Sequence, residues 1–274
     1  MSAMNSDSPS EAARRYLDLM ELVLTGVLIQ DPPIVTDSFR EFHRSVTRLA
    51  FPDAEPSEAE IARYAEDRRE AGLDHPSLAL TMIGRTRLRN FRGLIEAVLR
   101  EGVAGDIIET GVWRGVASIL ARAVLLAWGD KVRRILVADS FEGLPPPGPD
   151  YPADAGSRLH EERHLAVSLE TVRRNFEVFD LHDDQVVFLK GWFRDTMPTV
   201  PSDRLAVIRL DGDMYESTID PLNHLYDKLS PGGFVIVDDY WVPACRAAVE
   251  DFLSDRKLTP TLTPIDGMAI YFQK

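Results

Sequence analysis

The sequence has a single cysteine and lacks any long hydrophobic run. Cys245 has no partner in the chain, which excludes an internal disulfide and is compatible with a reducing compartment. The longest apolar stretches, such as Ala123–Trp128, are far shorter than the roughly 18 residues of a membrane-spanning helix. Residues 1–10 are polar and lack the basic start and apolar stretch of a signal peptide. We therefore expect a cytoplasmic protein without a membrane partner.

Basic residues are outnumbered by acidic ones. The 274 residues include 31 Lys and Arg against 44 Asp and Glu, which gives a net charge of −13. Such a charge repels phosphate backbones and anionic lipid headgroups, so nucleic acid is a poor partner. At about 150 residues per domain, the length allows one large domain or one domain with an appendage.

The N-terminal third contains helical patterns separated by a polar stretch with several prolines. Apolar residues recur at intervals of three and four from Ala12 to Ile29, which predicts a helix that Ser10 opens and Asp31-Pro32-Pro33 ends. One short helix is expected at 57–70, and a longer amphipathic helix is expected at 85–100.

Beyond residue 100, short apolar segments alternate with helical patterns. Strands are expected at 106–109, 135–138, 186–189, 205–210 and 234–237, and helices at 118–128, 169–179, 218–229 and 244–253. Apolar strands separated by helices are typical of a parallel sheet covered on both faces. Two further strands, 259–262 and 268–272, are joined by the hairpin dipeptide Asp266-Gly267. The sequence thus predicts a Rossmann-like, doubly wound α/β domain at 101–274, mostly parallel with an antiparallel C-terminal strand, and an N-terminal helical arm or lid at 1–100.

A glycine turn follows the first strand of this domain, in the sequence Glu109-Thr110-Gly111-Val112-Trp113-Arg114-Gly115. Ligands of such sheets bind at the carboxyl ends of the strands, where glycine lets them approach the backbone. The turn departs from the GxGxxG pattern, because Trp113 and Arg114 occupy the space that a pyrophosphate requires. It therefore favours a neutral or cationic nucleoside, and a plain tight turn is the alternative.

Asp139 ends the second strand. A carboxylate at this place can accept hydrogen bonds from a ribose diol, and the alternative is a capping or turn residue. The prolines at 145–147 predict a stiff loop over the site.

Acidic residues follow two further strands. Asp211 and Asp213 lie at the end of the fourth strand, and Asp238 and Asp239 lie at the end of the fifth. Four carboxylates in one crevice repel one another unless they share a cation, and a set of oxygen ligands suits Mg²⁺ or Ca²⁺. The alternative is a set of helix caps and solvated turn residues.

The sequence His160-Glu161-Glu162-Arg163-His164 matches the HExxH motif, in which two histidines one helical turn apart bind zinc. The segment follows a loop of glycine and proline, lacks flanking apolar periodicity and does not end a strand. We therefore favour a polar segment whose histidines face solvent or line the substrate mouth, and we keep a zinc hydrolase as an alternative.

Two other segments could contact a ligand. Gly191 and Trp192 follow the third strand, where the aromatic ring could stack on a purine or pack as an ordinary core residue. Met82, which precedes the helix at 85–100, could cover a ligand or simply fill the core.

Several of these segments resemble the macrocin O-methyltransferase family. The resemblance is carried by 107–115, 138–145, 189–193, 209–218 and 237–240, and by the shorter matches 16–19 and 81–84. It implies a class I S-adenosylmethionine-dependent enzyme that uses Mg²⁺ to methylate sugar hydroxyls of bacterial natural products such as macrolides and aminocoumarins. It also implies a homodimer and a small-molecule glycoside as substrate.

The resemblance also implies roles for individual residues. S-adenosylmethionine would be held by Glu109, Gly111, Asp139, Ser140, Gly191 and Trp192, with Met82 covering it. Mg²⁺ would be bound by Asp211, Asp238 and Asp239, with Asp213 as the general base. The metal would lower the pKa of a vicinal diol and align it for attack on the methyl group. The alternatives are a catechol-type phenolic O-methyltransferase and a nucleotide-binding module without activity.

Overall fold

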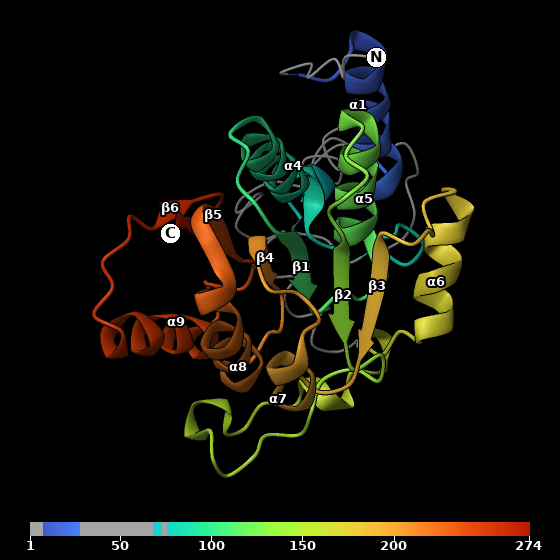
Figure 1. The fold of residues 1–274 in the computed structure, drawn as a ribbon. Coiled ribbons are helices and arrows are strands. Elements are labelled where there is room, and N and C mark those ends of the chain that lie inside the picture. Colours follow the sequence, from blue (N-terminus) through green and yellow to red (C-terminus); the bar gives the residue numbers. More distant parts are fainter. Residues whose placement is uncertain (1–7, 28–67, 73–75) are drawn as a thin grey trace, which may run out of the picture.

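The computed structural model describes residues 8–27, 68–72 and 76–274. Their centre is a seven-stranded sheet in the order β3-β2-β1-β4-β5-β7-β6 (Figure 1). The strands are β1 (Asp106–Thr110), β2 (Ile135–Asp139), β3 (Val186–Lys190), β4 (Leu205–Leu210), β5 (Leu229–Val237), β6 (Thr263–Pro264) and β7 (Ile270–Gln273). β1 to β5 are parallel, and β7 pairs antiparallel with β5 and β6. The predicted mostly parallel sheet with an antiparallel C-terminal strand is confirmed.

Helices cover both faces of the sheet. They are α1 (Glu11–Thr25), α4 (Gly84–Arg100), α5 (Val116–Trp128), α6 (Leu169–Val178), α7 (Phe193–Thr196), α8 (Tyr215–Leu225) and α9 (Pro243–Asp255). Short 3₁₀ helices lie at Pro152–Asp154, Leu159–Glu161, Arg163–Leu165, Met197–Thr199 and Tyr226–Lys228. None of the helices in the described ranges is long and apolar enough to cross a membrane.

The core consists of two apolar clusters, one on each face of the sheet. One cluster joins α1, α4, α5 and α6 to the sheet, and the other joins α8 and α9 to its opposite face. Figure 1 shows these groups apart, with α4 and α5 above α8 and α9. The strands β1, β2 and β4 are buried almost throughout, as expected for a sheet covered on both sides. The division of the chain at residue 100 stays a prediction, and α4 packs directly against α5.

The ends of α1 illustrate what the sequence did and did not reveal. The Ser10 side chain accepts a hydrogen bond from the Ala13 N–H and caps the helix, as predicted. The predicted end at Ile29 is wrong, because the helix ends at Thr25. Gly26 adopts a left-handed conformation (φ 62°) and donates its N–H to the Val23 carbonyl, which closes the last turn.

Part of the predicted helix at 57–70 lies outside the described residues, and so does the Asp31-Pro32-Pro33 stop. Residues 68–70 of the predicted helix are helical in the structure, and residue 71 continues the helix.

α8 begins three residues before the predicted start at 218. The side chain of Asp154 accepts hydrogen bonds from the N–H groups of Tyr215 (2.7 Å) and Glu216 (3.0 Å), so a residue about 60 positions away in the chain starts this helix. Local sequence patterns cannot reveal a cap of this kind.

The predicted strand at 259–262 is wrong in register, because β6 is Thr263–Pro264. The Asp266 side chain accepts hydrogen bonds from the N–H groups of Met268 and Ala269, which closes the turn. This turn places Pro264 opposite Ile270 and Thr263 opposite Tyr271. The pairing therefore starts immediately beside the turn, and β7 begins at Ile270 instead of 268.

Candidate active site

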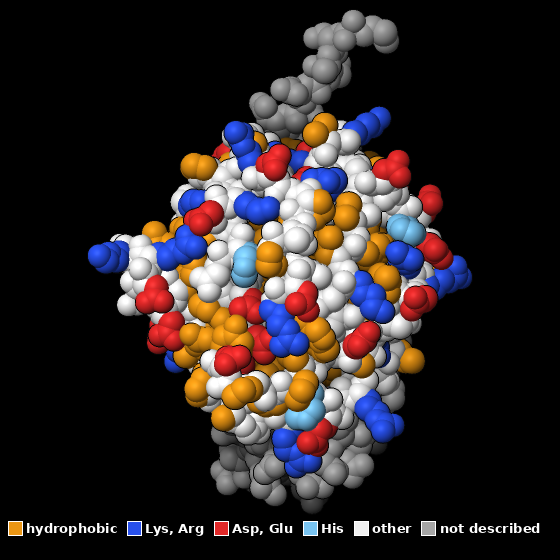
Figure 2. All heavy atoms as spheres, turned by 60° about the horizontal axis from the view of Figure 1, so that its bottom comes forward, with side chains coloured by type: hydrophobic (Ala, Val, Ile, Leu, Met, Phe, Trp, Pro, Cys, Tyr) orange, Lys and Arg blue, Asp and Glu red, His pale blue; other side chains and the backbone are white. Residues whose placement is uncertain are grey.

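The site lies at the carboxyl ends of the central strands, where the strand order reverses between β1 and β4. Gly111, directly after β1, has a φ of +84°, and a Cβ atom there would lie 1.6 Å from the carbonyl oxygen of Asp211. Only glycine permits this close approach of two strand ends. Figure 2 turns the lower side of Figure 1 forward and shows acidic and hydrophobic side chains mixed near its middle.

A first cavity opens beside this glycine turn. It comprises about 740 Å³, a volume that includes its open mouth. Of the seven residues expected to contact S-adenosylmethionine, the structure brings six to its wall: Met82, Gly111, Asp139, Ser140, Gly191 and Trp192. The cavity also contains Asp211 and Asp213. Glu109 lies instead on the wall of a second cavity.

The Asp139 carboxylate is held in place by backbone N–H groups. It accepts hydrogen bonds from the N–H of Val112 (2.8 Å) and of Phe141 (2.7 Å), which come from the turns after β1 and β2. Burial outweighs these bonds and raises the pKa of Asp139. Its remaining lone pairs can still accept hydrogen bonds from a ligand, because a carboxylate offers about four acceptor positions.

The second cavity adjoins the first. Its wall contains Arg87, Glu109, Arg209, Asp211, Asp213, Asp238, Asp239, Trp241 and Met268, together with apolar residues of 80–83 and α5. Met82, Trp113, Asp211 and Asp213 line both cavities, so the two spaces meet at these four residues. The two cavities are therefore adjacent.

Arg114 of the glycine turn holds the segment that carries Met82. Its guanidinium donates hydrogen bonds to the carbonyl oxygens of Ala79 (2.5 Å) and Ser77 (3.0 Å), and it stacks over the ring of Trp113. Of the two residues that depart from GxGxxG, Trp113 thus lines both cavities, and Arg114 holds the segment that carries Met82.

Three of the predicted acidic residues meet in space. One carboxylate oxygen each from Asp211, Asp238 and Asp239 lies within 4.8 Å of the other two. Among the described residues, these three side chains form the group that could bind one metal ion together. The adjacency of β4 and β5 brings them together, as their positions at two strand ends predicted.

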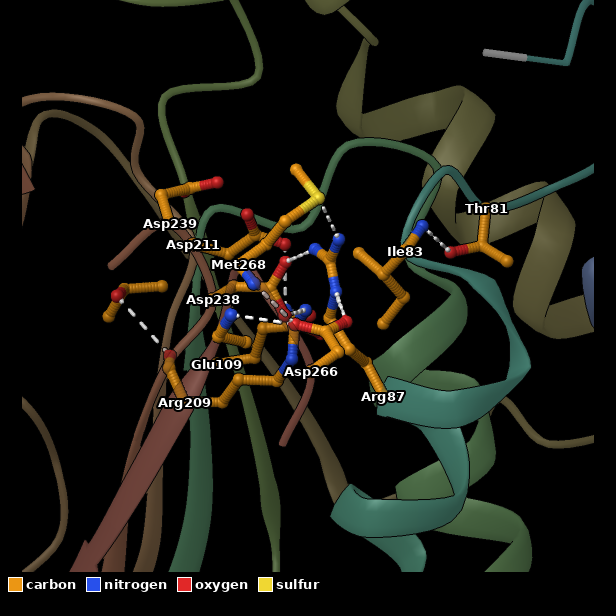
Figure 3. A network of polar contacts seen from close by, with 12 residues as sticks. Thr81, Ile83, Arg87, Glu109, Arg209, Asp211, Asp238, Asp239, Asp266 and Met268 are labelled. Carbon is orange, nitrogen blue, oxygen red and sulfur yellow. Dashed lines mark hydrogen bonds and ion pairs between the residues drawn. The ribbon is translucent and has the colours of Figure 1, made fainter. Parts of the chain in front are cut away.

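Two buried arginines that the sequence analysis missed also reach this cluster (Figure 3). Arg209 contacts Glu109 (2.7 Å), Asp211 (2.8 Å) and Asp238 (2.6 Å). Arg87 comes from α4 and contacts the other oxygen of Asp238 (2.5 Å).

Arg87 also joins the C-terminal hairpin to the cluster. It contacts Asp266 (2.8 Å) and the sulfur of Met268 (3.0 Å). Glu109 accepts a second bond from the Ser118 hydroxyl and so belongs to this buried network.

The carboxyl groups outnumber the two guanidinium groups, and their pKa values reflect the excess negative charge. Burial raises the pKa of Asp213 to about 7, helped by repulsion from Asp211, and it raises the pKa of Asp239 well above its usual range. Asp238 differs, since Arg209 and Arg87 outweigh its burial and lower its pKa. A further cation beside Asp211 and Asp239 would relieve this repulsion, so the donor set fits a hard divalent ion.

Asp213 is held in an uncommon backbone conformation. Its φ is +59°, which few residues other than glycine adopt at no cost, and its N–H donates to a carboxylate oxygen of Asp239 (3.1 Å). Such outliers persist where the surroundings fix them, as they often do at functional sites. Asp213 thus has a fixed place at the junction of the cavities.

Replacing Arg209 should destabilise the fold. Arg209→Met leaves Glu109, Asp211 and Asp238 without their shared buried cation, so we expect a loss of about 3–5 kcal/mol in the free energy of unfolding. Urea unfolding of the variant and the wild type measures this loss. Arg256→Met, which breaks an exposed pair with Asp227, is the control and should cost at most about 1 kcal/mol. Equal losses in both variants would contradict this account of Arg209.

Comparison with known proteins supports the resemblance on an independent basis. The family model of macrocin O-methyltransferase (TylF) matches residues 13–274. The chain belongs to this family. It is therefore an O-methyltransferase, and its fold implies S-adenosylmethionine as the methyl donor.

Similar proteins act in several antibiotic pathways. The methyltransferase is 49% identical over 265 residues (96% of this chain, 94% of the relative) to the 8-demethyl-8-(2,3-dimethoxy-alpha-L-rhamnosyl)-tetracenomycin-C 4'-O-methyltransferase of Streptomyces olivaceus. It is 43% identical over 271 residues (97% and 99%) to the mycinamicin III 3''-O-methyltransferase of Micromonospora griseorubida. It is 46% identical over 275 residues (98% and 95%) to the demethyldecarbamoylnovobiocin O-methyltransferase of Streptomyces niveus.

Among solved structures, that of the O-methyltransferase NovP is similar to this chain with a TM-score of 0.83 and 44% identity, covering 96% of this chain and 99% of that one. The similarity extends over the whole described fold.

The HExxH segment does not form a zinc site in the methyltransferase. Residues 159–165 fold as two separate 3₁₀ turns, so His160 and His164 do not share one face of an α-helix. The His164 carbonyl instead accepts a hydrogen bond from the Trp113 indole (2.8 Å), which ties this segment to the cavity junction. The alternative of a zinc hydrolase is wrong.

Proposed function

We propose that this enzyme transfers a methyl group from S-adenosylmethionine to a sugar hydroxyl of a glycosylated natural product, with Mg²⁺ as its metal and Asp213 as general base. The observation that carries the proposal is the pair of adjoining cavities. One is suited to a nucleoside and the other contains the acidic cluster, and they meet at Asp213.

The first cavity suits the methyl donor. Gly111 leaves room for close approach to the backbone, and Asp139 offers acceptors to a ribose diol beside Ser140. Trp192, next to Gly191, supplies an aromatic wall for the purine. Met82 covers the junction, where the sulfonium methyl must lie if it is to reach an acceptor in the second cavity.

The second cavity suits the acceptor. Asp211, Asp238 and Asp239 would hold Mg²⁺, while Arg87 and Arg209 fix the orientation of Asp238 from both of its oxygens. Mg²⁺ bound there would lower the pKa of a vicinal diol and orient its hydroxyls.

Asp213 is placed to accept the proton. When S-adenosylmethionine is bound, the sugar oxygen would form a bond to its methyl carbon while the carbon–sulfur bond breaks, and S-adenosylhomocysteine would be left. The hydroxyl proton passes to the Asp213 carboxylate. Burial raises the pKa of the Asp213 carboxyl, which makes its carboxylate a stronger base than that of an exposed aspartate.

The chemistry of the acceptor follows from the relatives and from the wall of the second cavity. The names of two relatives specify methyl transfer to numbered positions, 4' of a rhamnosyl-tetracenomycin and 3'' of mycinamicin III. In this chain, Trp241 lies at the rim of the acceptor cavity with 46% of its surface exposed, two residues after Asp239. Its backbone N–H donates to the Met268 carbonyl (2.9 Å), which fixes its position. An exposed indole at this point suits the apolar face of a sugar ring or of its aglycone.

Trp241→Ala is therefore expected to raise the KM for the acceptor about 10-fold, because the contact surface is lost at the rim. The affinity for S-adenosylhomocysteine should stay unchanged, since Trp241 does not line the first cavity. Steady-state kinetics and calorimetry measure the two quantities. Trp241→Phe keeps an aromatic surface and should recover most of the affinity, and an unchanged KM in Trp241→Ala would exclude this role.

The function itself is tested with purified enzyme, S-adenosylmethionine, Mg²⁺ and three acceptors: the demethyl glycosides of the tetracenomycin, mycinamicin and novobiocin series. We expect transfer to a sugar oxygen of at least one acceptor, located by NMR with a ¹³C-labelled methyl group, and loss of transfer on chelation by EDTA. Transfer only to a catechol would favour a phenolic O-methyltransferase. Transfer that persists at full rate in EDTA would contradict the metal assignment.

A further inference from the structure

The wall of the first cavity contains two acidic residues that the proposed chemistry does not use. Glu216 and Asp220 lie one turn apart on α8 and both line the cavity. They are 6% and 8% exposed, respectively. Two acidic side chains at this spacing repel each other in a helix, and burial strengthens the effect.

Their partners within the protein are incomplete. One oxygen of Asp220 accepts a hydrogen bond from the Tyr151 hydroxyl (2.9 Å), whereas the other is buried and has no hydrogen-bond partner in the described part of the chain. Glu216 contacts Arg194 at 3.3 Å, but the Arg194 side chain is 57% exposed. Burial raises the pKa values of both carboxyl groups. This part of the cavity wall thus contains one carboxylate oxygen of Asp220 without a donor among the described residues and a Glu216 carboxylate whose donor is exposed.

The surroundings of Glu216 and Asp220 indicate which part of the methyl donor would contact them. In the proposed function, the methyl group would lie at the junction with the acceptor cavity, next to Asp213, and the ribose would lie at Asp139 after β2. β3 follows β2 in the sheet, and α7, which begins after β3, packs against α8. The base of the donor would therefore lie between Trp192 and the acidic pair.

We infer that Glu216 and Asp220 recognise the exocyclic amino group of the adenine in S-adenosylmethionine. An amino group supplies the donors that the acidic pair lacks, whereas a purine without this group would leave the buried carboxylates without a partner. Asp220 would at the same time hold Tyr151, so the loop over the cavity and the base would share one side chain. This inference rests on the proposed function, since it assumes that the first cavity binds the methyl donor.

The test compares two ligands by calorimetry: S-adenosylhomocysteine and its 6-deamino analogue, in which the purine carries hydrogen at position 6. Loss of a hydrogen bond to a charged partner should weaken binding of the analogue to the wild-type enzyme about 10- to 100-fold. In Asp220→Ala and Glu216→Ala, the ratio of the two dissociation constants should fall toward one. A merely structural role would weaken both ligands equally and leave the ratio unchanged.

Asp251→Ala is the matched control. Asp251 accepts a hydrogen bond from the Tyr215 hydroxyl (3.0 Å), as Asp220 does from Tyr151, but it does not line the first cavity. Its loss should leave the ratio as in the wild type. Asp220→Asn keeps the volume of the side chain and should lower the ratio of the two dissociation constants by a smaller factor. This variant tests the inference if Asp220→Ala does not fold.

The outcomes separate the inference from the proposed function. If S-adenosylhomocysteine binds but the wild-type ratio is near one, or the ratio survives in both alanine variants, the inference is wrong and the proposed function stands. An equal fall of the ratio in Asp251→Ala also overturns the inference. If S-adenosylhomocysteine does not bind at all, both are contradicted.

Discussion

Asp239→Asn is expected to lower kcat on the order of 1,000-fold and to remove the stimulation of the remaining activity by Mg²⁺. The Asp239 carboxylate lies within 4.8 Å of those of Asp211 and Asp238, and it has no arginine partner in the described part of the chain to replace a cation. A metal that stabilises the developing alkoxide contributes several kcal/mol, which corresponds to this factor. The rate is measured at saturating S-adenosylmethionine over a range of Mg²⁺ concentrations.

The exposed Asp227, which pairs with Arg256 far from the cluster, provides the control Asp227→Asn and should retain the full rate. Asp211→Asn should resemble Asp239→Asn. If either variant in the cluster kept both the wild-type rate and the wild-type dependence on Mg²⁺, these carboxylates would not bind the metal.

Asp213→Asn is expected to lower kcat by about 100- to 10,000-fold, because an amide cannot accept the hydroxyl proton. The volume of the side chain is retained, and the N–H bond from residue 213 to Asp239 does not depend on the side chain. Binding of S-adenosylhomocysteine and of Mg²⁺ should therefore change little. Calorimetry for both ligands, together with single-turnover rates, separates the chemical step from binding.

The result that would contradict a general base at 213 is a single-turnover rate within a few-fold of the wild type. A variant that loses rate and Mg²⁺ affinity together would instead identify Asp213 as a metal ligand.

The sheet could be predicted because its strands are apolar almost throughout and its helices are amphipathic. The ends of elements were harder to place. The start of α8 depends on Asp154 in a distant loop, and the register of β6 depends on the turn closed by Asp266. Both are long-range or side-chain contacts that periodicity does not encode.

The acidic cluster could be predicted since it follows from topology alone. Adjacent parallel strands place their carboxyl ends together, so Asp211, Asp238 and Asp239 had to lie near one another. The two arginines could not be predicted in the same way. Arg209 lies within a strand that otherwise reads as apolar, and its 1% exposure is explained only by the three carboxylates around it. One available signal was its charge, since a charged residue inside a buried strand requires a partner.

Arg87 illustrates a further limit. It lies on the N-terminal helix α4 and contacts Asp238 and Asp266, which are more than 150 positions away in the chain. Nothing in the local pattern of α4 separates it from the other arginines of that helix. Its contacts place α4 beside the acidic cluster.

The account depends most on the joint binding of a dication and the methyl donor at the meeting point of the two cavities. Crystals grown with Mn²⁺ in place of Mg²⁺ and with S-adenosylhomocysteine test this directly through the anomalous signal of manganese. We predict one strong peak in contact with Asp211, Asp238 and Asp239, next to the sulfur of a ligand that lies along Gly111 and Asp139. A ligand-bound structure with no manganese peak at these three carboxylates, or with the sulfur pointing away from them, would contradict it.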